Sequence, residues 1–76
     1  MSLPLVSARE CIKALEKAGF YVDRQRGSHI ILARDDPPPA RTVSVPNYRE
    51  IKRGTLRTII RQAGLTVDEF NELLKA

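Results

Sequence analysis

The first hydrophobic pattern along the chain has the three- and four-residue spacing of a helix. The residues on this apolar stripe are Ala8, Cys11, Ile12, Leu15 and Ala18. Ser7 and Glu10 form a capping box at its start, in which each residue's side chain bonds a free backbone amide of the other. Gly19 follows the stripe and readily takes the left-handed conformation that ends a helix. The pattern therefore predicts an amphipathic helix between Ser7 and Gly19.

The period then changes to the alternation that is typical of strands. Residues 20–25 alternate, Gly27-Ser28 can turn, and residues 29–34 are mostly apolar. Residues 35–39 (Asp-Asp-Pro-Pro-Pro) form a stiff exposed connection, because proline lacks the amide donor that a sheet requires. Residues 42–45 make a short third strand. Since two antiparallel strands alone are barely stable, we expect a three-stranded sheet that helices cover on one face.

Helical spacing returns in the last third of the chain. The apolar residues at this spacing are Leu56, Ile59, Ile60 and Ala63. They predict a helix over residues 55–63, which Gly64 ends. Thr66 and Glu69 repeat the capping box and open a last short helix that extends through residue 74. The predicted order is αβββα with an extra short C-terminal helix, which is an α+β fold.

Size and composition narrow the classes of function. A chain of 76 residues has room for only one core, so residues 1–76 are predicted to form a single domain. Few apolar residues remain for the deep pocket of a metabolite enzyme, and a surface site for a large polymer fits better. The one cysteine, Cys11, cannot form an internal disulfide, and no signal peptide is recognised, so the cytoplasm is expected. No apolar run approaches the roughly 20 residues that span a bilayer.

The positive charge of the chain is concentrated in its middle. The net charge is +4, and residues 24–61 carry nine basic and only three acidic side chains. A positive field confined to one region attracts polyanions, which favours nucleic acid as the partner. The alternative is an ordinary solvated surface, since a net charge of this size is common for a small domain.

His29 is the only histidine, so no histidine pair exists to bind a metal. If Ile30 and Leu32 face the helices, alternation places His29 on the uncovered face of the sheet. The opposite register would place it against the core, and the run of Ile30, Ile31 and Leu32 does not decide between the two. A lone strand histidine is more often structural or merely exposed than catalytic.

The surroundings of His29 favour a catalytic role on RNA. Arg24 and Arg26 lie just before the turn and could hold a phosphate. RNA supplies its own nucleophile, the 2′-OH, so cleavage needs only a base, an acid and cations. Histidine has an unperturbed pKa of about 6.5 and can serve as that base near neutrality.

A second candidate anion site lies at the start of the helix predicted over residues 55–63. Lys52 and Arg53 precede Gly54-Thr55, where free amides and the helix dipole favour a phosphate. Arg57 and Arg61 extend the basic surface by further turns. The alternative for these two arginines is a solvated helix face, most of all for Arg61.

Three stretches of the chain carry a further signal: Gly27-Ser28-His29, the run LEKAGF over residues 15–20 and the run RGTLRTIIRQAG over residues 53–64. Together they resemble the HicA family of mRNA interferases. The match extends from Ser7 to Leu74. The resemblance implies a fold like the double-stranded-RNA-binding domain, a toxin that cleaves mRNA without a metal or other cofactor, and a HicB-type antitoxin partner that covers the active site.

The resemblance also assigns site residues. It implies that His29 is catalytic. Together with the charge pattern it predicts RNA contacts from Arg24, Arg26, Ser28, Lys52, Arg53, Thr55 and Arg57. Family members often carry another histidine after the third strand, in a Pro-x-His context, whereas this chain reads Pro46-Asn47-Tyr48. The general acid therefore stays open between Tyr48, Lys52 and water.

Two other functions compete with a nuclease. The first is a binding module of the same fold that holds double-stranded RNA without cleaving it. The second is a helix-turn-helix DNA reader built from residues 55–74. Charge argues against the DNA reader, because Asp68, Glu69 and Glu72 would repel a phosphate-lined groove.

Overall fold

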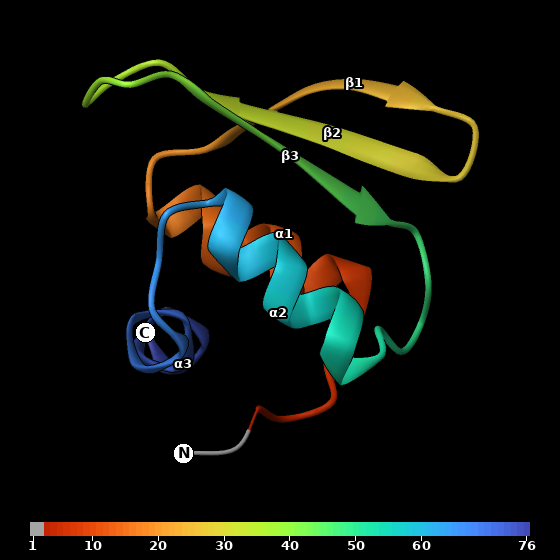
Figure 1. The fold of residues 1–76 in the computed structure, drawn as a ribbon. Coiled ribbons are helices and arrows are strands. Elements are labelled where there is room, and N and C mark those ends of the chain that lie inside the picture. The colour runs from red at the N-terminus through yellow and green to blue at the C-terminus, as the bar shows by residue number, and fades with distance from the viewer. Residues whose placement is uncertain (1–2) are drawn as a thin grey trace.

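Six elements follow one another in the computed structural model, which describes residues 3–76 (Figure 1). They are helix α1 (Ala8–Lys17), strands β1 (Tyr21–Arg26), β2 (His29–Arg34) and β3 (Arg41–Pro46), and helices α2 (Arg53–Gln62) and α3 (Val67–Lys75). The predicted αβββα order with an extra C-terminal helix is confirmed, and so is the α+β class. Among the described residues, no helix is long and apolar enough to cross a membrane.

Both predicted capping boxes form. At α1 the Ser7 hydroxyl accepts from the Glu10 amide at 3.1 Å, and the Ser7 amide donates to the Glu10 carboxylate at 2.9 Å. At α3 the Thr66 hydroxyl and the Glu69 carboxylate make the same reciprocal bonds at 3.1 and 2.7 Å. Each box satisfies two amides that a helix start leaves free. The boundaries of α1 and the start of α3 are thus set by local sequence.

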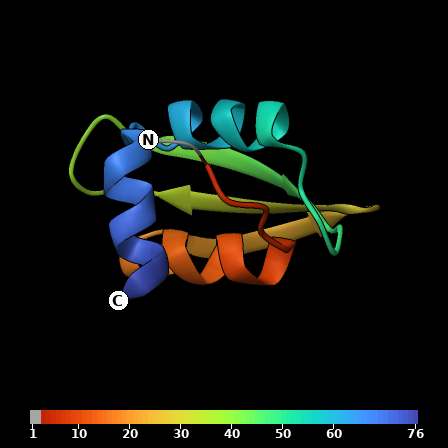
Figure 2. The same ribbon diagram turned by 90° about the horizontal axis from the view of Figure 1, so that it is seen from below.

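The three strands form an antiparallel sheet in the order β1-β2-β3. Helices α1 and α2 cover one face of this sheet, and α3 packs against α1 at one end (Figures 1 and 2). Leu32, Val43 and Val45 are fully buried beneath the helices. The other face has no helix over it. We call it the open face, and the strand register assigns to it Tyr21, Arg24, Arg26, His29, Ile31, Ala33, Thr42 and Ser44.

The core lies between the sheet and the three helices. Its largest fully buried side chains are Phe70, Leu3, Leu15, Leu32, Ile51, Leu56 and Ile59. Phe70 shows that α3 is part of this core. The segment before α1 also takes part, because the Ile51 amide donates to the Val6 carbonyl at 2.8 Å and ties it to the loop before α2.

Two arginines of the sheet cap the ends of the two long helices. Arg34 and Arg41 stand opposite each other on β2 and β3 and point to the helix side. The Arg34 guanidinium donates to the Ala18 carbonyl at the end of α1, at 3.1 Å, and Arg41 donates to the Gln62 carbonyl at the end of α2, at 3.4 Å. A cation at this end complements the helix dipole and the free carbonyls. Both arginines are therefore committed to the fold.

The start of α2 differs from its predicted position. The helix begins at Arg53, with Lys52 as N-cap, rather than at Thr55. The Lys52 side chain makes no capping hydrogen bond, so the usual sequence signal for a helix start is missing. As a result, Arg53 lies in the first turn of α2 rather than in the loop before it.

Candidate active site

His29 is the first residue of β2, and its side chain is exposed on the open face. The register pairs it with Arg26 of β1 on one side and with Pro46 of β3 on the other. Leu32, Val43 and Val45 take the covered face, so of the two registers that the sequence left open, the one with an uncovered His29 is correct. An imidazole in this position is accessible to a polymer that lies across the sheet.

A bulge in β1 sets which side chains accompany His29. The pairing shifts between Val22 and Arg24, where Asp23 is the extra residue. Simple alternation from Tyr21 would send Arg24 to the helix side, but the bulge returns it to the open face, opposite Ile31. Arg24 and Arg26 therefore share the face of His29, as the candidate site requires.

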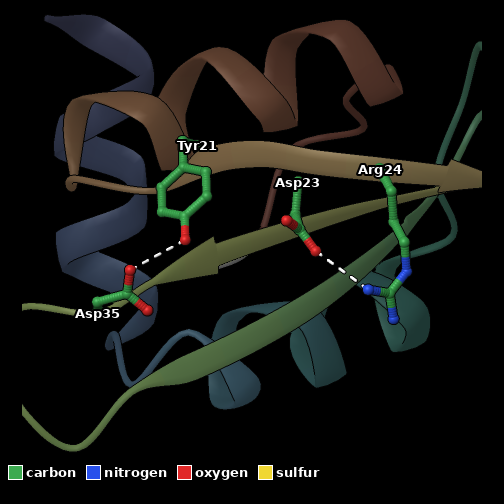
Figure 3. A network of polar contacts seen from close by, with 4 residues as sticks. All are labelled: Tyr21, Asp23, Arg24 and Asp35. Atoms are coloured by element: carbon green, nitrogen blue, oxygen red, sulfur yellow. Dashed lines mark hydrogen bonds and ion pairs between the residues drawn. The ribbon is translucent and has the colours of Figure 1, made fainter.

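The two arginines near His29 are free to meet an anion. The Arg24 guanidinium lies 3.2 Å from the Asp23 carboxylate, and both side chains are substantially exposed (Figure 3). An exposed pair of this kind contributes about 0–1 kcal/mol, so a phosphate could displace it. Arg26 is exposed too.

The chain around Tyr48 is tied to the His29 end of the sheet by its backbone. The Asn47 amide donates to the Ser28 carbonyl at 2.7 Å, which joins the turn before His29 to the loop after β3. The Tyr48 carbonyl accepts from the Ala8 amide at 2.9 Å. The Tyr48 side chain is 55% exposed and lines a shallow hollow of about 430 Å³ at the start of α1. His29 does not line this hollow, and the bond between Asn47 and Ser28 is the contact that links the Tyr48 loop to the turn before the histidine.

Ser28 lies in the β1–β2 turn, whereas the other predicted RNA contacts lie on the helix side of the sheet. Lys52, Thr55 and Arg57 are exposed at the start of α2 and within it. The β1–β2 turn and the start of α2 lie at the same end of the molecule in both views (Figures 1 and 2). The predicted basic surface is thus divided, with Arg24 and Arg26 on the open face and the α2 residues around the end of β3.

Arg53 makes a structural hydrogen bond that the sequence did not predict. Its Nε donates to the Leu3 carbonyl at 2.7 Å and so ties α2 to the N-terminal segment. Arg34, Arg41 and Arg53 are thus three basic residues of the segment 24–61 whose side chains donate to backbone carbonyls. Fewer guanidinium groups are therefore free to contact a polyanion directly than the sequence count suggests.

Other reactive groups of the described residues do not form a site. Cys11 is fully buried, and burial raises the pKa of its thiol to about 12, so it is a core residue and not a nucleophile. Within residues 3–76, no three side chains of His, Cys, Asp or Glu lie close enough together to hold a metal ion.

The fold and the candidate site define a small α+β protein in which an uncovered sheet face presents a single histidine beside two arginines. A model of one protein family, the HicA toxin of bacterial toxin–antitoxin systems, matches residues 8–65, and the chain belongs to this family. A comparison with curated proteins gives no match. The matched residues run from α1 to the turn before α3 and include every candidate site residue. Membership gives the protein the role of a toxin and implies an antitoxin partner.

Proposed function

We propose that this toxin is a metal-independent endoribonuclease of mRNA that acts in the cytoplasm and uses His29 as its general base. The observation that carries the proposal is the exposure of His29 on the open face, with Arg26 directly opposite it. A histidine that served the core would be buried and bonded. The exposed position beside cations is instead suited to a phosphodiester.

The chemistry needs little from the protein. His29 takes the proton of a 2′-OH, the 2′ oxygen attacks the adjacent phosphorus, and the bond to the 5′ oxygen breaks. The leaving oxygen takes a proton from an acid, so the products are a 2′,3′-cyclic phosphate and a 5′-OH. Arg24 and Arg26 would stabilise the charge that develops on the phosphate oxygens. Tyr48 is our candidate for the acid, and its loop is joined to the His29 turn by the bond between Asn47 and Ser28.

RNA binding should weaken steeply as salt rises, because the arginines replace counterions condensed on the RNA. Changing Arg24 and Arg26 together to Gln should flatten the slope of log K against log salt by about 1.4 units, at roughly 0.7 per contact with a single strand. The measurement is a titration of fluorescent RNA at several salt concentrations with catalysis disabled by His29→Ala. Lys13→Gln with Lys75→Gln removes the same charge from exposed sites elsewhere and should leave the slope unchanged. Equal slopes for the two double variants would show that Arg24 and Arg26 do not contact the RNA.

The antitoxin partner, which we propose to be of the HicB type, should inhibit by covering the open face. Acidic side chains of the partner would meet Arg24 and Arg26, and such complementarity mainly speeds association. The test is a cleavage assay with increasing antitoxin, beside hydrogen exchange of the complex. We expect loss of cleavage together with protection of β1 and the β1–β2 turn. A complex that leaves cleavage or these amides unaffected would show that occlusion is the wrong mechanism.

A further inference from the structure

The open face carries an exposed aromatic residue that the cleavage reaction does not use. Tyr21 is 45% exposed and lies at the opposite end of the face from His29. The register places it opposite Ala33, and Thr42 of β3 pairs with Ala33 in turn. These neighbours are small, so one surface of the tyrosine ring is left uncovered.

A hydrogen bond holds the ring in place. The Tyr21 hydroxyl donates to the Asp35 carboxylate at 3.0 Å, and the ring leans across β2 to reach it (Figure 3). This bond and the negative charge of Asp35 raise the pKa of Tyr21. A ring that is already oriented loses little conformational entropy when a ligand covers it.

Charge divides the open face into two ends. Arg26 and His29 lie at one end, with Arg24 next along β1 opposite Ile31, and this part of the face suits a phosphate. Asp35, which is exposed, lies at the other end beside Tyr21. A phosphate would be repelled from that end, whereas an uncharged aromatic base would be tolerated and could cover the ring.

We propose that Tyr21 is a platform on which an unpaired base of single-stranded RNA stacks while the RNA backbone is held at the arginine end. The inference rests on the proposed function, because it places the same substrate on the same face. At roughly 3.3 Å per residue, Ala33 lies about 13 Å along β2 from His29, so the stacked base flanks the scissile bond. Stacking needs a base outside a duplex, and this assigns the substrate as unpaired RNA.

The test compares Tyr21→Leu with Tyr21→Phe, both in the full chain carrying His29→Ala. Phe keeps the ring and loses only the bond to Asp35, whereas Leu keeps an apolar side chain and loses the ring. We expect Leu to raise the Kd for a single-stranded RNA oligonucleotide by roughly 5- to 150-fold, the usual size of one base–aromatic stack, and Phe, which loses only the bond that orients the ring, to raise it by much less. On an oligonucleotide without bases, the two variants should bind equally.

A second measurement keeps Tyr21 intact. The chain has two tyrosines and no tryptophan, so Tyr48→Phe leaves Tyr21 as the only strong intrinsic fluorophore. Added RNA should quench its emission. Equal Kd values for the Leu and Phe variants together with unquenched emission would overturn the stacking role, as would tighter binding of a blunt RNA duplex than of the single strand. Cleavage by the His29→Ala protein at the wild-type rate would instead overturn the proposed function and leave the stacking result standing.

Discussion

Replacing His29 with alanine is expected to slow RNA cleavage by roughly 10²- to 10⁴-fold and to leave the fold intact. The loss is the usual effect of removing a general base. The fold should survive because the side chain is exposed on the open face, and surface substitutions usually change stability by less than about 0.5 kcal/mol. Single-turnover cleavage and circular dichroism on the same two proteins would measure both quantities, and cellular toxicity should disappear with cleavage.

Tyr48→Phe is the matched variant that tests whether Tyr48 is the general acid. If Tyr48 is the acid, its loss should slow cleavage of ordinary RNA but not of RNA with a sulfur leaving group, which departs without a proton. His29→Ala should slow both substrates. A Tyr48→Phe protein that cleaves ordinary RNA at the wild-type rate would leave Lys52 or water as the acid.

The second prediction with a large effect concerns the packing of α3 in the core and its contribution to stability. Phe70 of α3 is fully buried, and Phe70→Ala should cost about 3–5 kcal/mol of unfolding free energy. A small domain has roughly 5–15 kcal/mol in total, so this variant should be close to unfolding at body temperature. Urea denaturation followed by circular dichroism would measure the loss.

Val22→Ala is the control for that measurement. Val22 is 50% exposed at the edge of the sheet and should lose less than about 1 kcal/mol. If the two variants unfolded at the same urea concentration, α3 would not belong to the core, and Phe70 would have to serve an interface instead.

The sequence predicts the elements of this fold well because their signals are local. Capping boxes at Ser7 and Thr66 and glycines at 19 and 64 mark helix ends through bonds made within a few residues. The early start of α2 escaped prediction for the same reason, since Lys52 carries no capping side chain. Where a helix start depends on tertiary contacts, here the bond from Arg53 to the Leu3 carbonyl, local sequence has no information about it.

The candidate site was predictable only in part. His29 and its flanking arginines can be read from the sequence, but whether they share a face depends on the strand register and on the bulge at Asp23. Neither follows from the run of apolar residues in β2. The commitment of Arg34 and Arg41 to helix ends was equally hidden, because it joins residues 16 and 21 positions apart. Charge counts along a sequence do not distinguish such arginines from those that remain free.

The measurement that tests the central claim most directly is single-turnover cleavage of an unstructured RNA with EDTA present. Wild type and His29→Ala are each given the RNA and a copy in which every 2′-OH is methylated. We expect wild type alone to cleave, only the unmodified RNA to be cut, and the new 3′ ends to be 2′,3′-cyclic phosphates. Equal cleavage by the two proteins, or cleavage of the methylated copy, would contradict a His29-driven attack by the 2′-OH.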